Sequence, residues 1–185
     1  IHSVVSEAPE TGGFKLHYYD DRGNRTLDVL GRAAAIDHIP AGVSGARGVL
    51  IGPILGETDF DFIRRVRKAT RGVLMLDPQG MLRREVNGAI EHVKPAGIEQ
   101  IVGLFDIVKP NELECQVLTG IDPRQDAETP ARMIHAWGPK TEPFLIPDTR
   151  GVGVRTQEGQ ATASHFDHTI AGLGEVGTPL DYPVI

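Results

Sequence analysis

Short apolar runs that alternate with amphipathic segments constrain the fold of this chain more than any other feature. Four runs have the length and composition of core strands: residues 48–54, 72–77, 106–109 and 143–146. The first, GVLIGPI, is continuous enough to predict a strand buried on both faces. Strands separated by helix-length segments predict parallel βαβ units. We therefore predict a doubly wound α/β fold, with a mainly parallel, Rossmann-like sheet and helices on both faces.

A β-hairpin is expected near the beginning of the chain. Residues 14–30 contain two roughly alternating segments that flank the turn sequence DDRGN. Because both segments carry polar residues, we expect this hairpin to project from the main sheet as a partial lid. The chain then divides into a lid hairpin with its connection at 1–38 and an α/β core at 39–185.

The other elements follow from periodicity and turn residues. Residues 151–156 and 161–166 predict a second hairpin across QEGQ. Helices are expected at about 57–70, 80–92, 97–104, 111–118 and 126–138.

Composition excludes several classes of function. The chain has 185 residues and a net charge of −6, which argues against nonspecific nucleic-acid binding and against an anionic membrane surface. No apolar run approaches the ~18 residues of a membrane-spanning helix. A single cysteine rules out an internal disulfide and suits the cytoplasm. Because the chain starts at Ile1 without a leader and stops abruptly, we expect it to be a piece of a longer gene product.

Polar residues follow two of the predicted strands, in the sequences LDPQG (76–80) and KPNELE (109–114). Ligands of open α/β sheets bind at the carboxyl ends of strands, so both junctions are candidate sites. Asn111 and Glu114 project from the same end of one predicted helix. Their amide and carboxylate could hold a hydrated Mg²⁺, or they could form a helix capping box. Spacing alone leaves both interpretations open.

The stretch DIVKPNELECQVLTG (106–120) closely resembles the ribokinase-like sugar kinase family of the phosphofructokinase-B type, in which a strand is followed by Asn-x-x-Glu and a helix ending in Leu-Thr-Gly. Residues 49–67 and 74–83 resemble the two preceding strand–helix units of that family, and DRGNRTL resembles part of its substrate lid. The likeness runs from about residue 10 to about 165. It implies a ribokinase-like core that lacks the family's N- and C-terminal segments.

The resemblance also implies a function. It predicts ATP-dependent phosphoryl transfer to a hydroxyl of a small sugar-like substrate, with Asn111 and Glu114 positioning Mg²⁺ and the ATP phosphates. Arg25, in the lid-like hairpin, is a candidate substrate contact, with a solvated turn arginine as the alternative. The lid is also a candidate surface for pairing with a second copy.

Two family motifs are altered or absent. Where the family has Thr-x-Gly-x-x-Gly beside the nucleotide, residues 146–151 read IPDTRG, so that only Gly151 matches. The glycine-rich anion hole with its catalytic aspartate has no counterpart, and Asp181 in the tail does not align with it by spacing. The catalytic residue therefore stays unassigned. A kinase-derived domain that binds a nucleotide or a protein partner without catalysis is the alternative function.

Other motifs predict ordinary structural roles. GLGEVG (172–177) leaves no room for the helix of a dinucleotide site and predicts a loop. His165 and His168 point to opposite faces at strand spacing, which disfavours a metal site. Cys115 is expected to be a core residue and RRVRK (64–68) the solvated face of a helix.

Overall fold

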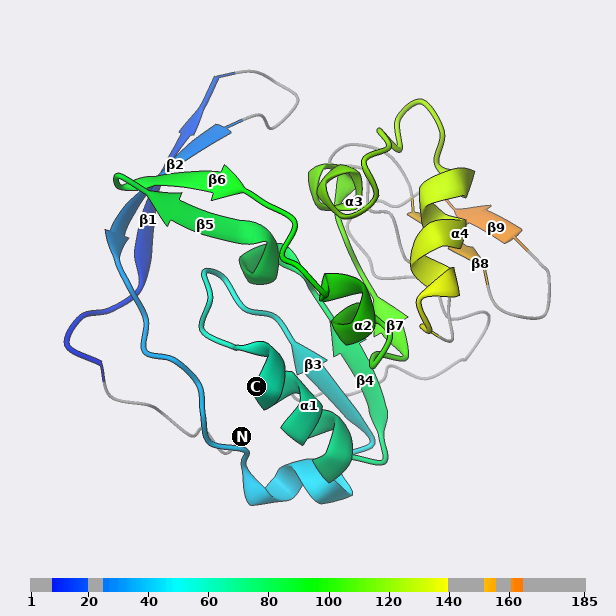
Figure 1. Cartoon of the computed structure of the whole chain (residues 1–185), viewed down its shortest axis with the longest axis horizontal. Coiled ribbons are helices and arrows are strands. Elements are labelled where there is room, and N and C mark those ends of the chain that lie inside the picture. The colour runs from blue at the N-terminus through cyan, green and yellow to red at the C-terminus, as the bar shows by residue number, and fades with distance from the viewer. Residues whose placement is uncertain (1–7, 20–24, 140–151, 156–160, 165–185) are drawn as a thin grey trace.

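A three-stranded parallel sheet forms the centre of the molecule (Figure 1). The computed structural model describes residues 8–19, 25–139, 152–155 and 161–164. Its strands β3 (Gly48–Ile51), β4 (Val73–Leu76) and β7 (Ile107–Val108) lie side by side in that order, and both pairings are parallel. Three of the predicted core strands and their parallel arrangement are therefore confirmed. The fourth, at 143–146, lies outside the described residues.

One face of this sheet is buried and the other is partly exposed. The register aligns one set of side chains on the buried face, and all of them are at most 7% exposed: Val49, Ile51, Leu74, Leu76 and Val108. On the opposite face, Leu50 and Val73 are each 47% exposed. The prediction that 48–54 is buried on both faces is therefore wrong for this strand, because a continuous apolar run does not reveal which of its faces is covered. Helices on the second face remain a prediction.

Four α-helices contribute to a single hydrophobic cluster with the buried face. They are α1 (Phe60–Ala69), α2 (Ile98–Val102), α3 (Glu112–Thr119) and α4 (Glu128–Ala136). Helix α1 begins where Asp59 accepts a hydrogen bond from the Phe62 backbone N–H at 2.6 Å, a standard N-cap. Helices α1 and α2 contact one another, as do α3 and α4. Among the described residues no helix is long and apolar enough to cross a membrane.

A second sheet, which we call the lid sheet, is antiparallel and has the order β1-β2-β6-β5. Strands β1 (Gly13–Tyr18) and β2 (Arg25–Gly31) form the predicted first hairpin. Strands β5 (Arg83–Val86) and β6 (Ala89–His92) complete the sheet, so the prediction of a helix at about 80–92 is wrong. The lid hairpin thus shares its sheet with residues that the sequence analysis assigned to the core.

The cause of this error is the turn between β5 and β6. Asn87 and Gly88 have φ of 52° and 82°, and the flanking Val86 and Ala89 are paired. An Asn-Gly pair with two positive φ angles makes the two-residue turn that suits a twisted hairpin. The helical structure in this region is limited to a short 3₁₀ helix, η2 (Gln79–Leu82), which precedes β5. A second 3₁₀ helix, η1 (Ala41–Gly45), precedes β3. Strands β8 (Val152–Arg155) and β9 (Ala161–Ser164) form the predicted second hairpin.

Candidate active site

The two junctions singled out from the sequence meet at the carboxyl edge of the parallel sheet. The backbone N–H of Asp77 donates to the carbonyl of Ile51, and that of Lys109 donates to the carbonyl of Leu76 (2.9 and 2.8 Å). These bonds continue the sheet ladder one residue past β4 and β7, and so fix both residues at one edge. Their side chains form an ion pair, with 2.9 Å between Lys109 Nζ and Asp77 Oδ2. Both junctions are candidate sites in the sequence, but their pairing is not apparent from it.

Asn111 and Glu114 form the capping box of α3. The Asn111 side-chain oxygen accepts from the Glu114 backbone N–H at 2.9 Å, and Glu114 accepts in return from the Asn111 backbone N–H at 2.8 Å. A third bond, from Asn111 Nδ2 to Glu114 Oε1 at 2.7 Å, locks the two side chains together. At its other end the helix stops at Gly120, whose φ of 79° is the left-handed conformation usual after a helix. The capping interpretation is therefore correct, and it holds both side chains beside the sheet edge.

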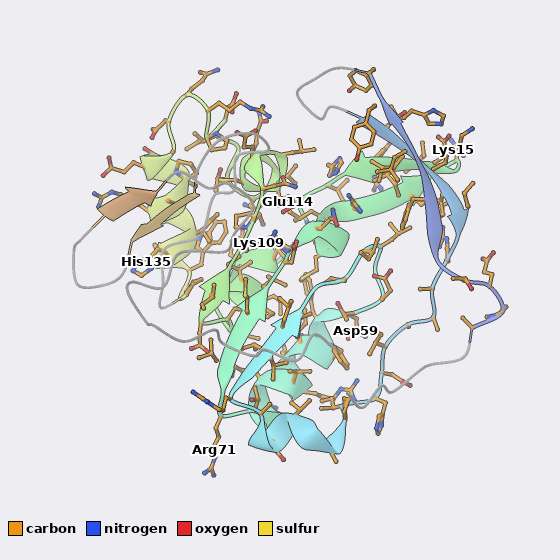
Figure 2. All side chains as sticks on the ribbon, turned by 180° about the vertical axis from the view of Figure 1, so that it is seen from behind. Lys15, Asp59, Arg71, Lys109, Glu114 and His135 are labelled. Carbon is orange, nitrogen blue, oxygen red and sulfur yellow. The ribbon has the colours of Figure 1, made fainter. Side chains whose placement is uncertain are left out.

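Glu114 is an unusual residue for a helix cap because it is only 3% exposed. Burial raises the pKa of its carboxyl group to about 7, and the nearby charge of Asp77 acts in the same direction. The Asn111 backbone N–H and the charges of Lys109 and Arg83 oppose this shift in pKa. The site thus combines two carboxylates and two cations around one strand edge. Figure 2 shows Lys109 and Glu114 in this part of the molecule.

The segment η2 connects this site to the lid sheet. It follows Asp77 after Pro78, packs against α3 and leads into Arg83, the first residue of β5. Arg83 Nη1 lies 3.3 Å from the carbonyl oxygen of Ile54, in the loop after β3. Gly80 lies so close to that loop that a Cβ would come within 2.4 Å of the Pro53 backbone, so only glycine fits. The parallel sheet and the lid sheet are therefore joined beside the site by η2, a short and tightly packed segment. The sequence does not predict this connection.

The oxygen ligands present here suit a hydrated Mg²⁺ rather than a metal enclosed by protein. Among the described residues, no group of three or more His, Cys, Asp or Glu side chains could hold a metal ion. Both oxygens of Glu114 already accept from Asn111, whereas the Asp77 side chain is 30% exposed. Mg²⁺ typically keeps several waters and takes one or two carboxylates plus substrate phosphates. Asp77 as a direct ligand and Glu114 as an acceptor from metal-bound water would match that preference.

The other candidate residues are not brought to this site by the described structure. Arg25 is the first residue of β2, with its backbone opposite Tyr18, and its side chain lies outside the described part. Gly151, Asp181, the His165–His168 pair and the 172–177 loop also lie outside it. Cys115 is fully buried in the core, and burial raises its thiol pKa to about 12, as expected for a structural residue.

The basic run at 64–68 is occupied by contacts within the molecule. Arg64 pairs with Asp61 at 2.7 Å, Arg65 donates to the Asp37 carbonyl at 2.9 Å, and Arg67 pairs with Asp106. These three contacts support the interpretation of this run as an ordinary helix face.

Comparison with known proteins supports the fold assignment. No family model matches the sequence, and no curated protein matches it. Among solved structures, the chain is similar to a sulfate complex of a pyrophosphate-dependent kinase in the ribokinase family, with a TM-score of 0.71 and 22% identity over 85% of this chain and 54% of that one. It is also similar to Arabidopsis thaliana ribokinase complexed with ribose and ATP (TM-score 0.57, 18% identity, 84% of this chain and 48% of that one). The chain is similar as well to ribokinase from Thermotoga maritima, with a TM-score of 0.57 and 18% identity over 88% of this chain and 50% of that one.

The chain therefore has the α/β fold of the ribokinase-family kinases, and the resemblance noted in the sequence is confirmed at the level of fold. It spans about half the length of each of these three structures, at 54%, 48% and 50%.

Proposed function

We propose that this chain is part of a carbohydrate kinase, which transfers the terminal phosphoryl group of ATP to a hydroxyl group of a small sugar-like substrate. The observation that carries the proposal is the arrangement of Asp77, Lys109, Asn111 and Glu114 at the carboxyl edge of a ribokinase-fold sheet. Ligands of open α/β sheets bind at this edge. The lid sheet is connected to the site through η2, which contacts α3.

Phosphoryl transfer depends mainly on positioning and on stabilising charge, and the described residues offer both. The Lys109 ammonium group can bind phosphate oxygens of the donor. Asn111 and Glu114 hold each other in a fixed orientation, so that a Glu114 oxygen can accept from a metal-bound water. Mg²⁺, when bound, would neutralise charge on the phosphates. Gly151 and Arg25 remain our candidates for contacts to the nucleotide and the substrate.

The donor has two chemical alternatives. Some of the similar structures are pyrophosphate-dependent kinases, one of them with myo-inositol, and another is a ribokinase complexed with ATP. Both donors carry a terminal phosphate that the Lys109 ammonium group could bind. The altered IPDTRG sequence makes pyrophosphate a necessary comparison in any assay.

Two further features belong to the proposal. Leu16 and Tyr18 lie on one face of the lid sheet and are 45% and 61% exposed, which supports a homodimer formed through the lid. A cytoplasmic location suits the single, buried cysteine.

The test is turnover by the protein expressed from its complete reading frame. Each member of a sugar, inositol and nucleoside panel is supplied with Mg²⁺ and either ATP or pyrophosphate, and release of ADP or phosphate is followed. We expect acceptor-dependent turnover that Lys109→Met abolishes and Lys94→Met, at an ion pair on the amino side of α2, leaves unchanged. ATP binding without turnover on any acceptor would favour the alternative, a non-catalytic domain derived from a kinase.

A further inference from the structure

The proposed reaction needs the Lys109 ammonium group and the Asp77 carboxylate, and these two groups form an ion pair with each other. Asp77 is the partly exposed carboxylate at the sheet edge, and Lys109 is the cation beside it. Their side chains are 30% and 27% exposed, so the pair faces solvent and both partners are accessible. In this structure each is engaged with the other.

Both members of this ion pair also act electrostatically on Glu114. Asp77 raises the pKa of Glu114 and Lys109 lowers it, so Lys109 acts on both carboxylates. Taking Lys109 away would leave two carboxylates opposed by Arg83 alone among the cations that act on Glu114. Such a site attracts a divalent cation more strongly than the paired site does. Conversely, a divalent cation on Asp77 would repel an ammonium group bound to the same carboxylate.

Lys109 is able to change partners. Its ammonium group stands on a flexible four-carbon stem, and its main chain is fixed by the sheet ladder at Leu76. A phosphate group at the sheet edge carries more negative charge than one carboxylate and competes for the ammonium group. Movement of the side chain alone, without movement of the backbone, would release Asp77.

We propose that Lys109 is a built-in counter-ion that occupies Asp77 until a phosphate donor removes it, so that donor and divalent cation bind cooperatively. The inference rests on the proposed function, because it concerns the same edge of the sheet. The donor takes Lys109, Asp77 becomes available to the cation, and each ligand strengthens binding of the other by the same factor.

The test measures Mn²⁺ binding by electron paramagnetic resonance of the free ion, without turnover. After subtraction of the Mn²⁺ that each donor binds in the absence of protein, wild-type protein should bind Mn²⁺ weakly alone and about 10-fold more tightly with a non-hydrolysable ATP analogue or methylenediphosphonate, within the usual range of coupling between sites. Lys109→Met should bind Mn²⁺ about 10-fold more tightly than wild type without any donor and should lose the coupling. Asp77→Asn should lose the Mn²⁺ site.

Two further variants keep the test decisive. Lys109→Gln retains a long polar side chain without the charge and should behave like Lys109→Met, which covers poor folding of the first variant. Lys94→Met removes the lysine of another ion pair, 2.7 Å from Glu99, and should keep wild-type Mn²⁺ binding and coupling.

The outcomes separate this inference from the proposed function. If both Lys109 variants bind Mn²⁺ no more tightly than wild type, or if no Mn²⁺ binds at all, the counter-ion inference is overturned even when the enzyme turns over. If Lys109→Met strengthens Mn²⁺ binding and abolishes coupling while no acceptor is phosphorylated, the inference holds and the kinase proposal fails.

Discussion

Two ion pairs of equal length lie at opposite ends of strands β4 and β7, and they differ in exposure and in their further hydrogen bonds. At the amino end, Arg67 Nη1 lies 2.9 Å from Asp106 Oδ2, and the same carboxylate accepts from the Leu74 backbone N–H at 2.9 Å. At the carboxyl end, Lys109 lies 2.9 Å from Asp77. The Asp106 side chain is 12% exposed and that of Asp77 is 30% exposed.

The difference lies in what surrounds each carboxylate. Asp106 is held by a backbone donor and by an arginine that also donates to the carbonyls of Thr70 and Gly72 (3.0 and 3.3 Å). Beside Lys109, Asp77 has a long contact of 3.4 Å with the Gln79 backbone N–H. A partly buried pair with several further hydrogen bonds serves structure, whereas a pair with a more exposed carboxylate and few further bonds contributes less to stability and leaves its groups available.

The largest predicted effect tests the amino-terminal pair. Asp106→Ala leaves Arg67 partly buried without this partner and removes the acceptor of the Leu74 N–H. We expect the free energy of unfolding, measured by urea denaturation, to fall by about 3–5 kcal/mol. Asp77→Ala and the exposed surface variant Asp61→Ala should each cost about 0–1 kcal/mol. Equal losses for Asp106→Ala and Asp77→Ala would remove the distinction between the two ends.

A second prediction concerns pH and Glu114. Between the ordinary pKa of 4.5 and about 7, the folded protein holds a proton that the unfolded chain has released. The free energy of unfolding should therefore fall as pH rises through this window, by up to about 3 kcal/mol, and stay low above it. Melting curves from pH 4.5 to 8.5 should show this slope in wild type and lose it in Glu114→Gln.

The control for this prediction is Glu91→Gln, a carboxylate in the lid sheet that is 51% exposed and pairs with Arg84 at 2.9 Å. It should retain the wild-type slope. If the slope persists in Glu114→Gln, the pH dependence of stability comes from another group and the prediction for Glu114 is wrong.

Of two local sequence patterns, one predicts its structure correctly and the other does not. The capping box links Asn111 to Glu114, three residues along one helix, and the pattern is readable from the sequence. The Asn87-Gly88 turn is equally local and was misread as part of a helix, although Asn-Gly between alternating residues is a strong hairpin signal. That misreading concealed half of the lid sheet.

The Asp77–Lys109 pair could not be predicted in the same way. Its two residues follow different strands, β4 and β7, and they meet only because the register places Leu76 opposite Val108. A shift of one residue in that register would turn the two side chains to opposite faces of the sheet. The sequence identified both junctions as candidate sites, but their contact depends on pairing between distant strands.

A third prediction concerns the effect of Asp77 on activity and on stability. Asp77→Asn keeps the shape of the side chain and removes the charge, so it should lower kcat/KM of the proposed kinase by about 100-fold, equivalent to about 2.7 kcal/mol. The free energy of unfolding should change by no more than about 1 kcal/mol. Steady-state kinetics and urea denaturation on the same preparation provide both values. A variant that loses activity and stability together would show that the carboxyl-end pair is also structural.

The smallest predicted effect separates the two roles of Asn111. Asn111→Ala removes the oxygen that caps α3 and should cost about 1 kcal/mol of unfolding free energy. Asn111→Ser restores an effective capping oxygen, so its stability should return close to wild type, but serine cannot reach Glu114 Oε1 as the Nδ2 group does. If the residue serves only as a cap, Asn111→Ser should have wild-type activity. If it also orients Glu114 for the proposed reaction, Asn111→Ser should melt like wild type and need a higher Mg²⁺ concentration for half-maximal activity, because a carboxylate held by the backbone N–H alone is less firmly oriented toward metal-bound water.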